Sequence, residues 1–194
     1  MSSIAASKAE EEQLVALEAY LKGALGDIDG AGGSTDEEIM MWIWENTSSS
    51  AGSARIVMRC VLETAPTALI EDAATAKASA AKLCKAIERR QTLLKKYNSC
   101  PDNAAEQMKR QANCLFEVQR YCATANWPQG LAKMLFYKLY DDDIVFEDAY
   151  SVWRENDDDS TPGKLKALAE VKEFLQWLET PNEEDGDGDD DGDD

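Results

Sequence analysis

Apolar residues recur along this chain at intervals of three and four positions, the spacing of one buried face of an α-helix. The first stretch of this kind contains Leu14, Leu17, Leu21 and Leu25. A Ser7-x-x-Glu10 pair before it has the form of a capping box, and a Gly-rich stretch at 23–33 follows it. No stretch alternates apolar and polar residues as a strand does. The pattern therefore predicts helices throughout.

The middle of the chain continues this helical pattern. A second capping box, Thr35-x-x-Glu38, precedes an apolar set made of Ile39, Met40, Ile43 and Trp44. Another helix is expected from about residue 54 to Pro66, since the residue before a proline disfavours helical geometry. The residues 77–96 then predict one long basic helix whose apolar edge consists of Leu83, Ile87 and Leu94.

The last third has the clearest helical patterns. Asn103-x-x-Glu106 predicts a helix start, and Pro128 is expected to open the next helix. A short helix is expected from Phe146 to Trp153. Thr161-Pro162 has the form of a cap followed by a proline in the first turn of a last helix. That helix has the apolar residues Leu165, Leu168, Val171, Leu175 and Leu178.

The order of these elements predicts the fold class. All five prolines fall at inferred boundaries, and short loops join successive helices. Such a chain is expected to form antiparallel helix pairs that stack as a solenoid, with a compact helical bundle as the alternative. We expect one helical domain over residues 1–180. An acidic tail at 181–194 has no apolar residue to bury and is expected to be disordered.

Composition narrows the possible functions. The 194 residues contain 20 Lys and Arg, 38 Asp and Glu and no His, which gives a formal net charge of −18. The lack of His removes the commonest general base and metal ligand, so we expect neither catalytic residues nor a cofactor or metal. The charge also disfavours non-specific binding to nucleic acids. Only the 77–96 stretch, with a local charge of +6 (seven basic residues and Glu88), offers a possible contact with RNA phosphates, with Tyr97 alone nearby for stacking.

The cysteines indicate the compartment. The five cysteines include no C-x-x-C pair, so they predict neither a zinc site nor a disulfide framework. We expect small buried residues or ordinary thiols in the cytosol. The chain has neither a signal-peptide pattern at its start nor an apolar run long enough for a membrane helix.

One loop invites comparison with a calcium site. Asp27, Asp29, Gly32 and Glu38 match positions 1, 3, 6 and 12 of an EF-hand loop. Ala31 offers no side-chain oxygen at position 5, and Glu38 is already assigned to the capping box of Thr35. The preferred interpretation is a Gly-rich linker without a metal.

Two segments combine large aromatic residues with carboxylates. The first runs from Leu139 to Trp153, and the second comprises 174–179 followed by 183–185. If the rings anchor to the helices, the hydrated acids around them could bind a Lys-rich ligand through ion pairs and cation–π contacts. The alternative is that most rings are core and the acids form a solvated rim, and we expect both to hold in part.

These two segments resemble the aromatic/acidic boxes in the C-terminal HEAT-type domain of translation initiation factors. That family includes initiation factor five, the epsilon subunit of initiation factor two-B and the four-gamma scaffolds. The resemblance is specific from about Leu115 to Glu184, and residues 126–130, 140–153 and 162–180 look most like the four-gamma-related branch of death-associated protein five. It implies a HEAT-type solenoid, and a position at the C-terminal end of a larger scaffold.

The resemblance also implies a non-catalytic docking function in translation initiation. The implied partners are Lys-rich segments of the beta subunit of initiation factor two and the basic segment of a MAP-kinase-interacting kinase. A structural capping domain and an RNA-binding domain remain the alternatives. The residues expected to contact a partner are Tyr140, Asp141, Asp142, Asp143, Phe146, Glu147, Asp148, Tyr150, Trp153, Trp177, Glu179, Glu183, Glu184 and Asp185.

Overall fold

The computed structural model describes residues 2–27, 31–48, 50–65 and 73–180. In these ranges the regular secondary structure is helical, as the sequence predicts, and no strand is formed. The helices are α1 (Ser2–Ala24), α2 (Asp36–Asn46), α3 (Ala51–Glu63), α4 (Ala73–Arg89), α5 (Gln91–Asn98), α6 (Ala104–Thr124), α7 (Leu131–Asp141), α8 (Glu147–Glu155) and α9 (Lys164–Leu178). The predicted tail at 181–194 lies outside the described residues.

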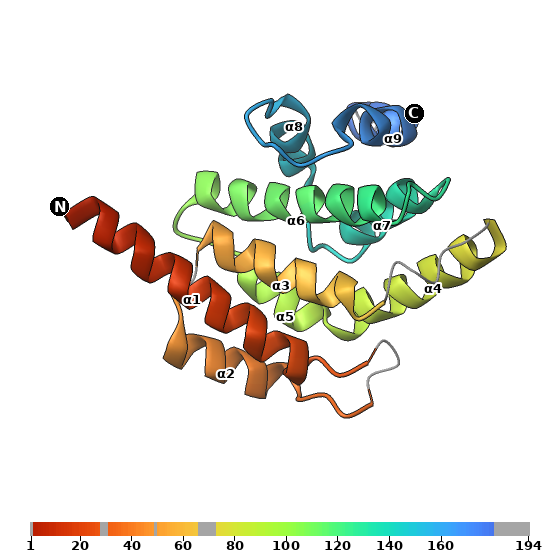
Figure 1. The fold of residues 1–194 in the computed structure, drawn as a ribbon. Coiled ribbons are helices and arrows are strands. Elements are labelled where there is room, and N and C mark those ends of the chain that lie inside the picture. The colour runs from red at the N-terminus through yellow and green to blue at the C-terminus, as the bar shows by residue number, and fades with distance from the viewer. Residues whose placement is uncertain (1, 28–30, 49, 66–72, 181–194) are drawn as a thin grey trace, which may run out of the picture.

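The helices stack in successive layers, which confirms the predicted HEAT-like arrangement (Figure 1). Helices α1 and α2 form one end of the stack, α3 to α7 fill its middle, and α8 and α9 form the other end. One hydrophobic core runs through all the layers, from Leu17 through Val57 and Leu115 to Trp153, and each of these side chains is fully buried. No helix within the described ranges is both long and apolar enough to span a membrane.

Local capping signals predict some helix ends correctly. Thr35 accepts a hydrogen bond from the Glu38 amide, and the Glu38 carboxylate accepts one from the Thr35 amide, which confirms the capping box. The Asn103 side chain likewise caps α6. The Ser7 prediction is wrong, since α1 already begins at Ser2 and Ser7 lies within it.

The two prolines predicted to open helices do not occupy the first turn. Helices α7 and α9 start after Gly130 and Gly163, which are N-cap residues with φ of 81° and 92°. Glycine adopts this left-handed geometry without the steric cost that a side chain adds. The hydroxyl of Thr161, predicted as a cap, instead accepts a hydrogen bond from Arg55 at 2.6 Å.

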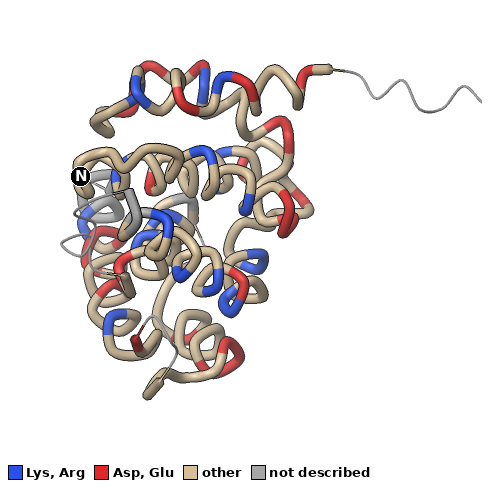
Figure 2. The backbone as a smooth tube through the Cα atoms, turned by 90° about the vertical axis from the view of Figure 1, so that its right-hand side faces the viewer, with Lys and Arg blue, Asp and Glu red and all other residues tan. Residues whose placement is uncertain are grey.

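The prediction of a single basic helix over 77–96 is wrong, because the chain there forms two helices, α4 and α5, separated at Arg90. The Arg90 side chain is buried, and its guanidinium donates to the carboxylate of Asp36 at 2.8 Å and to the carbonyl oxygens of Leu25 and Ser34. It therefore ties the break to the loop between α1 and α2. Elsewhere, Lys and Arg are interspersed with Asp and Glu along the described chain (Figure 2).

A buried carboxylate cluster joins α3, α6 and the segment before α9. Glu117 on α6 is fully buried and accepts hydrogen bonds from Arg55, Arg59 and Arg120, at 2.5 to 3.0 Å. Arg55 also donates to Asp159 at 2.7 Å, across the layer boundary. Burial alone would raise the pKa of Glu117, but the hydrogen bonds from the three arginines outweigh it and lower that pKa below its ordinary value.

Two residues predicted on apolar helix faces point to solvent instead. Trp44 on α2 is 82% exposed, and Leu165 on α9 is 83% exposed. The neighbouring positions behave as predicted, since Ile39, Ile43 and Val171 are fully buried. The helical period is therefore right, but the buried face is narrower than the apolar face.

Candidate functional site

The fold brings the two aromatic/acidic segments together. Tyr140, at the end of α7, contacts two rings of α9: its ring centroid lies 5.6 Å from that of Trp177 and 6.0 Å from that of Phe174. Phe174 in turn lies 5.3 Å from Tyr150 on α8. These edge-on contacts are a favoured geometry of aromatic pairs. Residues more than thirty positions apart in sequence thus form one aromatic cluster.

Two of the rings expected to contact a partner are buried under this cluster. Trp153 is 0% exposed and donates its indole N–H to the side-chain oxygen of Gln119 at 3.1 Å. Tyr150 is 1% exposed and donates to the carbonyl of Phe136, and burial holds the pKa of its phenol well above the ordinary value. A partner cannot reach either ring in this conformation, so the prediction that they contact a partner is wrong. Both rings instead belong to the core on which the cluster packs.

The exposed rings form the outer surface of the cluster. Trp177 is 52% exposed and Tyr140 is partly buried, while Phe146, which makes no ring contact with the cluster among the described residues, is 49% exposed before α8. Tyr137, which the sequence analysis missed, is 50% exposed and its ring centroid lies 6.1 Å from that of Phe174. Its position three residues before Tyr140 places it on the same helix face, a spacing that could have identified it from the sequence.

The acids of the first segment lie in the turn between α7 and α8. Asp141 ends α7, Asp142 is its C-cap, and Asp143 adopts a φ of 52° in the turn that follows. Glu147 and Asp148 occupy the first turn of α8. All are exposed except Asp142.

Asp142 is a structural member of this turn, which corrects its assignment as a contact residue. Its carboxylate accepts a hydrogen bond from Lys138 at 2.9 Å, and its backbone carbonyl accepts one from Gln91. Burial alone would lower the pKa of Lys138, but the hydrogen bond to Asp142 and that carboxylate's charge raise it above its ordinary value.

The exposed acids differ in their partners. Asp143 has a loose ion pair with Lys95, 3.6 Å apart, and Glu179 at the end of α9 is bonded to Arg154 of α8. Among the described residues, Asp141, Glu147 and Asp148 have no ion-pair partner within 4 Å. The remaining predicted contact residues, Glu183, Glu184 and Asp185, lie outside the described residues.

The electrostatics of this turn oppose folding at one point. A helix carries partial negative charge at its C-terminus, so a carboxylate there destabilises the helix. The cost is comparable to the ~0.3–1 kcal/mol by which a cation at the same place stabilises it. Lys138 and Lys95 offset the charges of Asp142 and Asp143. Asp141 has no ion pair within 4 Å among the described residues, whereas Glu147 and Asp148 are favourably placed at the N-terminus of α8.

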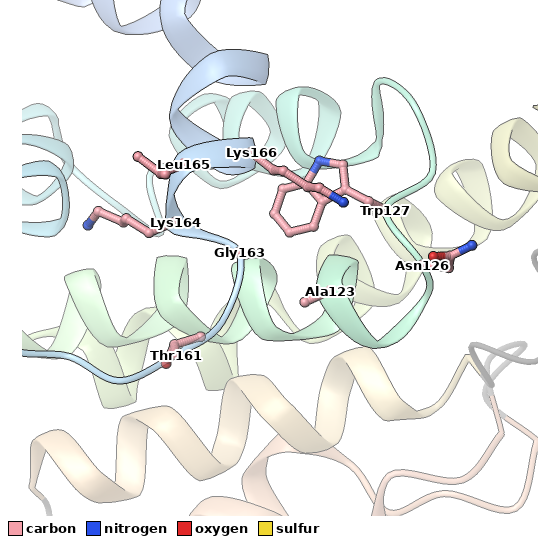
Figure 3. A pocket seen from close by; sticks show the side chains of 8 residues that line it. All are labelled: Ala123, Asn126, Trp127, Thr161, Gly163, Lys164, Leu165 and Lys166. Carbon is pink, nitrogen blue, oxygen red and sulfur yellow. The ribbon is translucent and has the colours of Figure 1, made fainter.

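A second feature of this region is an open groove of about 470 Å³ between α6 and α9. Figure 3 shows the indole of Trp127 beside Gly163 in this groove. The indole N–H donates to Glu170 at 3.0 Å, and a side chain at residue 163 would lie 2.5 Å from the ring. Trp127 thus connects the end of α6 to the start of α9. This contact gives a structural role to the Asn126–Gly130 segment, which is part of the family resemblance.

The described residues contain no group of three or more Cys, Asp and Glu arranged to hold a metal ion. In the loop with EF-hand-like spacing, the Asp27 carboxylate accepts from the Ala31 amide and Glu38 is used in the capping box, while Asp29 lies outside the described residues. The five thiols are free, and burial raises the pKa of Cys60 and Cys114 to about 12, which makes both poor nucleophiles.

The described residues thus form an all-helical stack whose last layers join the first aromatic/acidic segment to residues 174–179 of the second. Residues 110–188 match the family described as W2: eIF4-gamma/eIF5/eIF2-epsilon, a range that contains both segments. The chain is also 28% identical over 153 residues to human eukaryotic translation initiation factor 4 gamma 2, which covers 76% of this chain and 17% of that protein. It is 28% identical over 153 residues to human 4 gamma 3 and 29% identical over 156 residues to mouse 4 gamma 1, and covers 9% of each. These similarities relate the chain to translation initiation factors.

Proposed function

We propose that this chain is a non-catalytic docking domain of a translation initiation scaffold that binds Lys/Arg-rich segments of partner proteins. The observation that carries the proposal is the meeting of the two aromatic/acidic segments. Tyr140 and Trp177 are in ring contact, and exposed acids lie on the adjoining α7–α8 turn. This surface lies within the range that matches the W2 family.

The chemistry of the surface favours a cationic ligand. Asp141, Glu147 and Asp148 offer carboxylates without an ion-pair partner among the described residues. Trp177 and Tyr137 offer half-exposed rings over which a Lys or Arg side chain can lie. A basic segment would also relieve the unfavourable charge of Asp141 at the end of α7. Because Asp141 at this position destabilises the fold, its presence favours a role in binding over a role in folding.

The proposed partners are the beta subunit of initiation factor two and a MAP-kinase-interacting kinase, each through a basic segment. We also propose a cytosolic location and a closer relation to the branch of death-associated protein five. The chain spans only 17% of human eukaryotic translation initiation factor 4 gamma 2, so these statements rest on the chemistry of the surface and on the family resemblance.

Two alternatives receive less support. RNA binding through residues 77–96 is disfavoured by the burial of Arg90 and of Tyr97, the one ring near enough to stack on a base. A purely structural capping role gives no reason for an unfavourably placed Asp141 or for half-exposed rings in contact.

A charge-reversal variant tests the proposal. Asp141→Lys, Glu147→Lys and Asp148→Lys together change exposed residues, so folding should change by only ~0–1 kcal/mol for each. The affinity for a Lys-rich segment of the beta subunit, measured by calorimetry, should fall at least about tenfold through lost attraction and added repulsion. It should also fall with added salt, because screening acts over about 8–10 Å.

A matched control separates local from overall charge. Glu10 and Glu11 on α1, and Asp102 in the turn between α5 and α6, are exposed acids outside this surface, and their replacement by Lys makes the same change in net charge. The control should leave the affinity within about twofold of the wild type. Equal losses in both variants, or none in the first, would show that the aromatic/acidic surface is not the docking site.

A further inference from the structure

The outer face of α2 carries a second cluster of exposed apolar side chains. Trp44 is 82% exposed and Met41, three residues before it, is 62% exposed. Residues three apart on a helix are neighbours, so the two side chains form one patch. Isolated exposed apolar residues are ordinary, but an exposed Trp beside an exposed Met is the composition found at the centre of binding surfaces.

The structure gives this patch no role in folding. Helix α2 is anchored by the buried Ile39 and Ile43, which face the opposite side. The other tryptophan of the helix, Trp42, stacks on Tyr20 of α1 with ring centroids 3.9 Å apart and is partly buried. Trp44 has no ring or hydrogen-bond contact of this kind within the described chain.

Acidic residues surround the patch. Glu37 lies four positions before Met41, Glu45 lies four positions after it, and both are exposed. The helix contains no Lys or Arg. The remaining acids of the first turn are already used, since Asp36 binds Arg90 and Glu38 closes the capping box. The two free carboxylates therefore flank an apolar centre.

This face lies far from the aromatic/acidic surface. Helix α2 packs on α1 and α5 at one end of the stack, whereas α8 and α9 form the other end (Figure 1). No single short segment can cover both. A ligand on α2 would consequently be independent of the one proposed above.

We propose that the outer face of α2, formed by Glu37, Met41, Trp44 and Glu45, is a second docking surface for a Lys/Arg-rich segment that carries a large apolar residue. The apolar residue packs on Met41 and Trp44, and the basic side chains pair with the two carboxylates or lie on the indole face. The charge argues for this occupant, because an acidic segment or a phosphate backbone would be repelled by the same carboxylates. A domain with basic-segment surfaces at both ends could hold two segments at once.

The indole N–H signals in a proton–nitrogen correlation spectrum test the proposal directly. The chain has five tryptophans, and a Trp44→Phe spectrum assigns the signal of Trp44 by its loss. The probe is a synthetic peptide of repeated Lys-Lys-Leu triplets, added to the full chain. The Trp44 signal should shift in a saturable manner, and this shift should persist when Asp141, Glu147 and Asp148 are replaced by Lys.

Two variants and a control test the chemistry of the surface. Two double variants should each weaken peptide binding at α2 by about tenfold: Glu37→Lys with Glu45→Lys, and Met41→Ser with Trp44→Ser. Because the second variant lacks the Trp44 indole, its binding is measured from the backbone amide signals of neighbouring residues. Leu165→Ser is the matched control. Leu165 is equally exposed but has Lys164 and Lys166 beside it, so its loss should leave binding at α2 unchanged.

Three results would overturn the proposal. The Trp44 signal could stay in place at peptide concentrations that shift the Trp177 signal, which would leave the function proposed for the aromatic/acidic surface intact. A peptide of Glu-Glu-Leu triplets could shift Trp44 equally, which would remove the role of charge. Dilution of the free protein could shift Trp44, which would identify a second copy of the chain as the occupant.

Discussion

Replacement of Glu117 by Gln should destabilise the domain strongly although it changes a single side chain by one atom. The carboxylate accepts four hydrogen bonds, from Nε of Arg55, Nε and Nη2 of Arg59 and Nε of Arg120. A Gln keeps one acceptor oxygen but turns an amide donor toward these cations. Removal of one partner of a buried ion pair costs about 3–5 kcal/mol, because the remaining charge is left without compensation.

The structure favours the lower part of this range. The side chains of the three arginines are about 25% exposed, so water can solvate them in part. Arg55 also keeps Asp159, and Arg120 keeps Glu63. We therefore expect a loss of about 3 kcal/mol in the free energy of unfolding. Urea denaturation followed by circular dichroism measures it as a lower midpoint at an unchanged slope.

The pH dependence gives an independent check. The pKa of Glu117 is lower in the folded than in the unfolded chain, so its contribution is fully present above the ordinary Glu value of about 4.3. That contribution is lost as the pH falls through the folded value. The difference in stability between the wild type and Glu117→Gln should therefore be constant near neutral pH and shrink below about pH 4.

A control and a refuting result complete this test. Glu63→Gln removes a carboxylate that also binds Arg120, at 2.9 Å, but is 35% exposed, so it should cost only ~0–1 kcal/mol. If Glu117→Gln stays within about 0.5 kcal/mol of the wild type, as ordinary surface substitutions do, the cluster does not join the layers as argued.

Three further predictions concern other parts of the fold. Trp153→Ala should cost about 3–5 kcal/mol in urea denaturation, since its ring is fully buried, whereas the half-exposed Trp177 should cost about 1–2 kcal/mol when replaced; equal losses would contradict the burial described. Gly163→Ala should cost more than Gly130→Ala, because both positions add about 1–2 kcal/mol of left-handed strain but only the first pushes a side chain into an indole. Asp141→Asn should increase the free energy of unfolding by about 0.3–1 kcal/mol, and so raise the melting temperature, while it weakens the binding of a Lys-rich segment. A lower melting temperature would refute the unfavourable placement of Asp141 at the end of α7.

The sequence predicts the helices well because their signals are local. The apolar period of each helix and the Thr35 and Asn103 caps depend on residues within one turn of each other. The break at Arg90 does not, because the partners that bury its side chain lie more than fifty positions away, in Leu25, Ser34 and Asp36. A helical period continues smoothly through such a residue. The sequence alone therefore predicts one long helix.

The candidate site was predictable only in part. The resemblance identifies both aromatic/acidic segments, but ring contact between Tyr140 and Trp177 depends on how α7 and α9 cross. The burial of Asp142 depends on Lys138, four residues before it on the same helix, and on Gln91 of α5. The first of these contacts follows from helical spacing, whereas the second requires the tertiary structure.

Trp44 shows why an apolar period cannot by itself tell core from binding surface. Both need large apolar side chains on a helix, and the sequence analysis assigned Trp44 to the same buried set as Ile43. Their difference lies in the helix face that each occupies: Ile43 faces the core, whereas Trp44 shares its face with Met41 and the exposed Glu37, whose charge would be costly to bury. A large aromatic residue on a helix face that also carries unpaired carboxylates therefore indicates a face that stays in water until a cationic partner covers it.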